Sequence, residues 1–294
     1  MGQVEIIAEV GECFNGKMES AYAMIRAAAE AGCDIVKFQL LDMAEVAADD
    51  PEYDWFASLE LDPGRIQNLV ACAESAGLDI LFTPVSVKTA GWLHEAGLSK
   101  VKVASSFIRK RELLDYINGH FRQVYISTGM AGLDEIVEAV RLLDKTKDLT
   151  IMHCISEYPT GPLLEQRGLC ALREEDAHLE MMLILQELFP QHRVGYSDHT
   201  DGIFVPITAA AMGAQVIEKH ITLDRQTPLE HFAKGLPYMG TDHVLSIEPP
   251  QLREMVAKIR HVEKVRGAHI WQRTEGENIL KDFLRGRYRE GRKR

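Results

Sequence analysis

Two short strings near the end of the chain give histidine and oxygen-bearing side chains the same spacing. GYSDHT places Ser197 two residues before His199, and IEKHIT places Glu218 two residues before His220. In a strand, side chains two residues apart share a face. Two imidazoles from adjacent strands would begin a site for a borderline divalent metal. The alternative is two buried, hydrogen-bonded histidines without a metal, but the paired spacing favours the metal.

Two lysines stand in segments that are otherwise apolar. Lys37 and Lys102 each lie between two apolar neighbours in a β-rich run. A buried ammonium is costly unless an anion pairs with it. Hydroxyl side chains fall at the ends of similar runs, at Thr83, Ser105, Ser127 and Ser197. Ammonium and hydroxyl groups together predict a cradle for a phosphate or carboxylate. The alternative is that each lysine pairs with a carboxylate of the chain, such as Glu9 or Glu218.

Eight short apolar runs alternate with amphipathic segments along the chain. The runs cover residues 4–10, 34–40, 79–84, 100–105, 123–128, 150–155, 193–198 and 215–221. This alternation predicts parallel strands with right-handed crossovers. Eight units predict a single (β/α)8 TIM barrel of the α/β class, in which the carboxyl ends of the strands build the active site. A doubly wound open sheet is the alternative, but no G-x-G-x-x-G follows the first run.

Composition limits the classes of function. The chain has 294 residues and a net charge of −11, which argues against generic nucleic-acid binding. Five cysteines without a C-x-x-C pair, no signal peptide and no apolar run of membrane-spanning length predict a cytoplasmic protein with no membrane partner. We expect a catalytic barrel over residues 1–267 and a basic tail over residues 268–294.

Several of these strings also carry a resemblance to a known family. In chain order they are IIAEVG, DIVKFQ, FTP, KVAS, STGMAGLDEI, HCISEYPT, GYSDHT, EKHITLDR and GTDHVLSIEP, and the resemblance covers roughly residues 5–266. The set resembles the sialic acid synthase family, which includes N-acetylneuraminate, legionaminate and pseudaminate synthases and spore coat polysaccharide biosynthesis proteins E. The resemblance implies a metal-dependent condensation of phosphoenolpyruvate with an N-acetylated aldose. The products would be a nonulosonic acid, used for surface polysaccharides, and phosphate.

The resemblance assigns roles to individual residues. His199 and His220 would bind the metal, with Mn2+ expected and Mg2+ or Co2+ as alternatives. Phosphoenolpyruvate would be held by Lys37, Thr83, Lys102, Ser105, Ser127 and Ser197. The sugar would contact Ser156, Tyr158 and Asp242, and the catalytic carboxylates near the reacting carbons would be Glu9 and Glu218. The resemblance further implies a homodimer.

Four departures from the family pattern concern the sugar side. Cys13 and Phe14 stand where the family has Asn and His, and Ser106 and Phe107 follow KVAS where it has Gly and usually Glu. Residues 226–239 are expected to be an insertion, and the tail to be a remnant of the linker to a missing antifreeze-like domain. The alternatives are therefore a synthase for another aldose or aldose phosphate, or a non-catalytic paralogue that binds phosphoenolpyruvate or a sugar.

Overall fold

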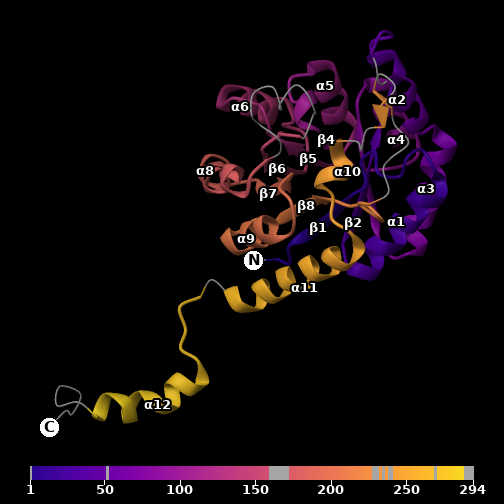
Figure 1. Ribbon diagram of the computed structural model, residues 1–294. Coiled ribbons are helices and arrows are strands. Elements are labelled where there is room, and N and C mark those ends of the chain that lie inside the picture. Colours follow the sequence, from indigo (N-terminus) through magenta and orange to yellow (C-terminus); the bar gives the residue numbers. More distant parts are fainter. Residues whose placement is uncertain are drawn as a thin grey trace. The chain divides into compact units, whose positions relative to one another are not determined.

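The computed structural model describes residues 2–50, 53–158, 172–226, 232–233, 236–237, 241–267 and 270–287. Within these residues, eight strands form one parallel sheet (Figure 1). They are β1 (Glu5–Glu9), β2 (Ile35–Leu40), β3 (Asp79–Pro84), β4 (Lys100–Val103), β5 (Gln123–Ser127), β6 (Asp148–Cys154), β7 (Arg193–Asp198) and β8 (Val216–His220). The order is β3-β2-β1-β8-β7-β6-β5-β4, and the end strands β3 and β4 lie side by side. The sheet thus curls into the predicted (β/α)8 barrel.

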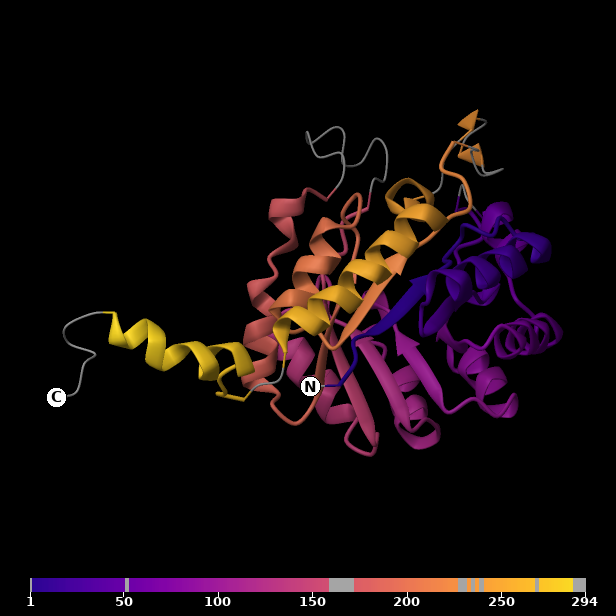
Figure 2. The same ribbon diagram turned by 90° about the horizontal axis from the view of Figure 1, so that it is seen from below.

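Helices cover the outside of the sheet (Figures 1 and 2). Those that follow the strands are α1 (Met18–Ala31), α2 (Tyr53–Leu59), α3 (Pro63–Ser75), α4 (Val87–Glu95), α5 (Arg111–His120), α6 (Leu133–Leu142), α8 (Glu180–Leu188), α9 (Phe204–Met212), α10 (Thr241–Leu245) and α11 (Pro249–Arg266). Local signals start several of them: the Asp62 side chain accepts from the Arg65 N–H at the start of α3, and Ser86 and Thr89 form a capping box on α4. None of the described helices is long and apolar enough to cross a membrane.

Short elements complete the described chain. They are the 3-10 turns η1 (Met43–Glu45), η2 (Ser105–Phe107) and η3 (Glu174–Ala177), and the antiparallel pair β9 (Phe232–Ala233) and β10 (Leu236–Pro237). Most of the insertion expected at 226–239 lies outside the described residues. The chain divides into two compact units, Gly2–Val265 and Arg266–Arg294. The second contains α12 (Glu275–Gly286), which begins with a capping box between Thr274 and Glu277.

The barrel interior is layered. One apolar layer consists of the inward-facing residues Ile7, Ile35, Leu81, Tyr125, Met152 and Val216. Because strand side chains alternate, the residues two positions further along also point inward, nearer the carboxyl ends of the strands. On β2 and β8 these residues are Lys37 and Glu218, both buried. The apolar layer therefore closes the floor beneath a polar one.

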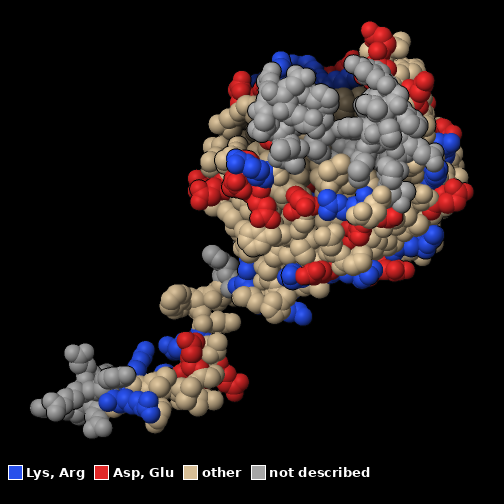
Figure 3. Space-filling view, viewed as in Figure 1, with Lys and Arg blue, Asp and Glu red and all other residues tan. Residues whose placement is uncertain are grey.

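Charge on one face of the barrel is mixed. On the barrel face shown in Figure 3, the described acidic and basic side chains are interspersed. Nucleic-acid binding surfaces concentrate Lys and Arg on one face or along one helix. The face in view therefore shows no such concentration of described basic side chains.

Candidate active site

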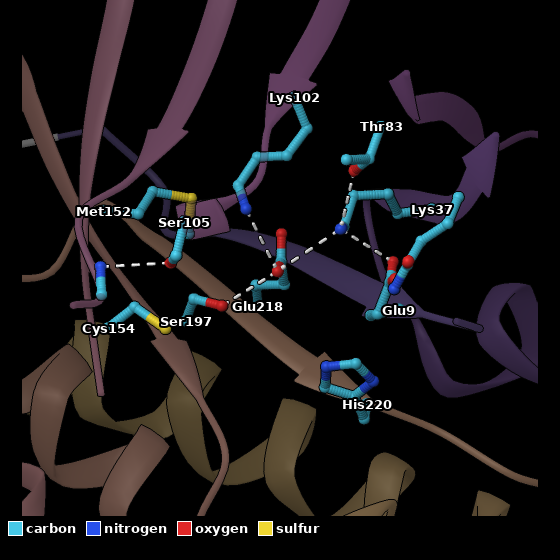
Figure 4. Close-up of polar contacts among 12 residues, drawn as sticks. Glu9, Lys37, Thr83, Lys102, Ser105, Met152, Cys154, Ser197, Glu218 and His220 are labelled. Atoms are coloured by element: carbon cyan, nitrogen blue, oxygen red, sulfur yellow. Dashed lines mark hydrogen bonds and ion pairs between the residues drawn. The ribbon is translucent and has the colours of Figure 1, made fainter. Parts of the chain in front are cut away.

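The predicted site residues gather in one cavity at the carboxyl ends of the strands (Figure 4). It is lined by Glu9, Lys37, Gln39, Thr83, Lys102, Ala104, Ser105, Ser106, Ser127, Cys154, Ser156, Tyr158, Ser197, His199, Glu218 and His220. Asp242 lines an adjoining pocket that shares Gln39 with this cavity. The sequence prediction thus selected residues that the fold brings together from seven of the eight strands, all but β6, and from the loops that follow the strands.

Both buried lysines converge on one carboxylate oxygen. Lys37 Nζ and Lys102 Nζ each lie 3.5 Å from Glu218 Oε1. Lys37 Nζ also lies 3.0 Å from Glu9 Oε2 and donates a hydrogen bond of 3.2 Å to Thr83 Oγ1. Lysine–carboxylate pairing, the alternative that the sequence allowed, is thus present in the cavity. The two ammonium groups nevertheless flank a common space, as an anion cradle requires.

The charge state of this cluster follows from its burial. Burial would raise the pKa of Glu218, but Lys102 and Lys37 outweigh it and hold that pKa at about 2. Ser197 Oγ adds a hydrogen bond of 2.9 Å to Glu218 Oε1. Burial lowers the pKa of Lys102, although Glu218 opposes the shift. Glu218 is therefore a carboxylate at neutral pH.

Hydroxyl groups occupy the side of the cavity formed by β4, β5 and β6. Ser127 Oγ is buried and has no hydrogen-bond partner among the described residues. Ser105 Oγ accepts a hydrogen bond of 3.1 Å from the Gly129 N–H. A Cβ at Gly129 would collide with the hydroxyls of Ser156 and Ser105. The glycine of the STGM string therefore lets two hydroxyls approach the backbone after β5.

The two motif histidines lie side by side, with ring centroids 5.3 Å apart. His199 Nδ1 donates to the Ile155 carbonyl at 2.9 Å, and its Nε2 lies 3.0 Å from the Tyr158 hydroxyl. His220 Nδ1 is buried and has no hydrogen-bond partner among the described residues. Burial and the neighbouring His199 hold the pKa of His220 well below its usual range. A neutral imidazole is the form that binds metals.

Asp242 is held at the rim beside His220. Its Oδ2 lies 3.7 Å from His220 Nδ1 and accepts a hydrogen bond of 3.3 Å from the Glu12 N–H. Its own N–H donates to Glu12 Oε1 at 3.2 Å. Gly11 has a positive φ of 52°, and a Cβ there would collide with the Asp242 carboxylate. The IIAEVG and GTDH strings therefore meet through this glycine.

The donor set fits a divalent metal in chemical type. His199 directs Nε2 into the cavity because its Nδ1–H is engaged by a carbonyl, the usual outer partner of a ligating histidine. His220 contributes a buried nitrogen without a hydrogen bond, and Asp242 is the nearest carboxylate. Within the described part of the chain, no group of three or more His, Cys, Asp and Glu is already arranged to hold a metal ion. A metal held by only two imidazoles would keep positions for water and substrate, as a catalytic rather than a structural site does.

The histidine that begins the HCISEYPT string does not face the cavity. The Nε2 of this residue, His153, donates to the Ala177 carbonyl at 2.8 Å, and His153 does not line the cavity. The neighbouring Cys154 lines the cavity, with Sγ 3.9 Å from His199 Nδ1. The signal was present in the alternation: Met152 belongs to the inner layer, so Cys154 must face inward too.

The two phenylalanines that depart from the family pattern, Phe14 and Phe107, lie in different surroundings. Phe14 lines the pocket that adjoins the cavity, together with Gly11, Glu12, Gln39, Leu41, Phe56, Leu59 and Asp242. Phe107 does not line either pocket; it is half-buried, packs against the main core and lies under the Lys110 ammonium. The 3-10 turn η2 directs Ser106 to the cavity in its place. Phe14 therefore borders the pocket beside the cavity, and Phe107 does not.

Comparison with known proteins identifies the family of this chain. The model of the NeuB family matches residues 24–270. The N,N'-diacetyllegionaminic acid synthase of Campylobacter jejuni is 32% identical, covering 97% of this chain and 85% of that protein. The structure of a Leptospira borgpetersenii N-acetylneuraminic acid synthetase in complex with citrate superposes with a TM-score of 0.83 at 28% identity, covering 96% of this chain and 91% of that one. For spore coat polysaccharide biosynthesis protein spsE of Bacillus subtilis, the TM-score is 0.74 and the identity 30%, with 96% and 78% of the two chains covered. The chain belongs to the NeuB family.

Proposed function

We propose that this protein condenses phosphoenolpyruvate with an N-acetylated aldose to give a nonulosonic acid and phosphate, with the help of a divalent metal. One observation supports this most strongly: two buried lysines meet at the carboxyl ends of a barrel, next to two imidazoles and a set of hydroxyls. Relatives named as sialic acid-type synthases support the same reaction class. The nonulosonic acid would serve surface polysaccharide synthesis.

Phosphoenolpyruvate would occupy the lysine and hydroxyl side of the cavity. Lys37 and Lys102 would bind its anionic groups, and Thr83, Ser105, Ser127 and Ser197 would donate neutral hydrogen bonds. The unpartnered Ser127 hydroxyl is one donor ready for a ligand. These groups would fix the enol so that C3 faces the aldehyde, which lowers the barrier by proximity.

The aldehyde would sit on the imidazole side of the cavity. His199 and His220 would hold a divalent ion, Mn2+ by our expectation, and when bound the ion would polarise the aldehyde oxygen as a Lewis acid. Ser156, Tyr158 and Asp242 would orient the sugar from the rim. A bond would form between C3 of phosphoenolpyruvate and the aldehyde carbon, and water would then add at C2 with release of phosphate. Glu9 and Glu218 would stabilise the positive charge that develops at C2.

Phosphate release over a panel of aldoses, with Mn2+ and phosphoenolpyruvate held constant, tests this function. We expect turnover with at least one N-acetylated aldose and none after removal of divalent metal by chelation. Turnover confined to an aldose phosphate would indicate a synthase for another sugar class. Tight phosphoenolpyruvate binding without turnover on any aldose would identify a non-catalytic binding protein and contradict the proposal.

We predict that the preferred aldose carries a methyl group where N-acetylmannosamine carries a hydroxymethyl group. The pocket beside Asp242 has an apolar wall of Phe14, Leu41, Phe56 and Leu59. Such a wall gains from burying a methyl group but leaves a hydroxyl without a partner. A 2,4-diacetamido-2,4,6-trideoxy hexose should therefore exceed N-acetylmannosamine in kcat/KM by about tenfold or more. Initial rates of phosphate release under identical conditions measure the ratio.

Two phenylalanine variants make this prediction specific to the pocket. Phe56→Ser should reduce the preference for the deoxy sugar, because it places a hydroxyl in the apolar wall. Phe107→Ser is a matched control, since Phe107 is also half-buried but lines neither pocket. A preference for N-acetylmannosamine in the unmodified protein, or equal changes in both variants, would show that this wall does not select the sugar.

The oligomeric state and the cellular compartment are also proposals. We propose that the protein is a homodimer, and its mass in solution tests this. We place it in the cytoplasm, because Cys13, Cys33, Cys72 and Cys154 all carry free thiols, as in a reducing compartment.

A further inference from the structure

A buried ion pair lies on the opposite side of β7 and β8 from the cavity. Lys219 Nζ lies 2.6 Å from Asp198 Oδ2, and neither side chain is exposed. Asp198 precedes His199, and Lys219 precedes His220. Because strand side chains alternate, Ser197 and Glu218 face the cavity while this pair faces outward. The pair thus joins the backs of the two strand ends that carry the imidazoles.

Further hydrogen bonds tie the backbone around His199 to the same pair. Asp198 Oδ1 accepts from the Thr200 N–H at 3.2 Å and from the Tyr196 hydroxyl at 2.9 Å. The Thr200 hydroxyl donates to Asp198 as well, and Lys219 Nζ donates to the Thr200 carbonyl. His199 is therefore enclosed between two anchored residues, and the ammonium that anchors them belongs to the neighbour of His220.

This network is larger than strand pairing requires. Backbone hydrogen bonds already join β7 to β8, with Ser197 opposite Glu218 and Asp198 opposite Lys219. A buried ion pair is often no more stable than apolar residues of the same size. It does impose one geometry, because its ammonium and carboxylate must stay paired. A fixed geometry is what two ligands on separate strands need if they share one ion.

We propose that Lys219 and Asp198, supported by Tyr196 and Thr200, form a clamp that sets the spacing of His199 and His220 for metal binding. The inference rests on the proposed function, because it assumes that the two histidines are ligands. Lys219 and Asp198 touch no substrate in this account; they are positioning residues. The clamp would act on metal affinity and would leave the lysine and hydroxyl side of the cavity unchanged.

Calorimetric titration of the full chain with Mn2+, and separately with phosphoenolpyruvate without metal, tests the clamp. Lys219→Met should weaken Mn2+ binding by about 10–100-fold, the usual effect of losing an outer partner of a metal ligand, with phosphoenolpyruvate affinity unchanged. Tyr196→Phe removes one hydrogen bond to Asp198 and should weaken Mn2+ binding less. Tyr125→Phe is its matched control, because Tyr125 is equally buried but donates to Glu5 at the opposite end of the barrel.

A double variant separates positioning from stability. Lys219→Met combined with Asp198→Asn removes both charges, and the Asn Oδ1 can still accept from Tyr196 and Thr200, so this variant should fold and melt much as the unmodified protein does. The clamp predicts that the Mn2+ affinity of this variant is lower than that of the unmodified protein. Mn2+ affinity equal to that of the unmodified protein would overturn the clamp and leave the metal site intact. No Mn2+ binding by the unmodified protein would instead overturn the metal site itself, and the clamp with it.

Discussion

Replacing either cavity lysine with methionine should weaken phosphoenolpyruvate binding by about 2–5 kcal/mol, the effect of truncating one partner of a buried charge pair. Lys37 and Lys102 are each almost fully buried and reach the same oxygen of Glu218. Each variant would lose an attraction to the ligand and leave the Glu218 carboxylate less compensated, so that the ligand would also meet a stronger repulsion. Calorimetric titration with phosphoenolpyruvate in the absence of aldose measures the effect.

Lys100→Met is the matched control for the lysine prediction. Lys100 lies on the same strand as Lys102, two residues before it, so both side chains lie on the same side of the strand. Lys100, however, pairs with Asp79 at the other end of the barrel. Its removal should leave phosphoenolpyruvate affinity unchanged. Unaltered affinity in both Lys37→Met and Lys102→Met would mean that the lysines serve only to neutralise Glu9 and Glu218.

Replacing His199 and His220 together with alanine should abolish Mn2+ binding and lower turnover by about 10³-fold or more, because Lewis-acid polarisation of a carbonyl contributes several kcal/mol. The two rings are adjacent, and His220 Nδ1 is buried without a hydrogen bond in the described chain. Phosphoenolpyruvate should still bind, because its proposed ligands are the lysines and hydroxyls. Mn2+ titration by calorimetry and phosphate release at saturating Mn2+ give the two readouts.

His153→Gln provides the comparison for the histidine pair. His153 is also buried near a strand end, but its Nε2 donates to the Ala177 carbonyl and glutamine retains a donor. Its Mn2+ affinity should match that of the unmodified protein. Normal Mn2+ binding by the double alanine variant would refute the assignment of the ligands, whatever its turnover.

The barrel could be predicted because its signals are local and repeated. The apolar run 34–40, for example, became β2 (Ile35–Leu40), and the run 193–198 became β7 (Arg193–Asp198). Once eight such units alternate with helices, topology alone brings the strand ends together. The grouping of Lys37 with His220 therefore needed no knowledge of side-chain contacts.

Other features depend on packing that residue types do not specify. That both lysines share Glu218 follows from strand register and side-chain length, and the sequence allowed Glu9 as a partner equally well. The orientation of Phe107 depends on the short turn η2, whose sequence Ser-Ser-Phe has no strong directional signal. The Lys219–Asp198 pair lies within the GYSDHT and IEKHIT strings that indicated the site. The pairing of these two outward-facing residues depends on how β7 and β8 are aligned, which the strings do not specify.

The carboxylates that pair with the two lysines set the net charge of the cavity. Glu9 and Glu218 balance Lys37 and Lys102 one for one, so these four groups sum to zero net charge before any substrate enters. An anionic substrate therefore cannot enter as a simple counter-ion; it must bring positive charge with it or compete with Glu218 for the ammonium groups. The measured affinity for such a substrate is therefore the net of two interactions of the ammonium groups, one gained with the substrate and one given up with Glu218.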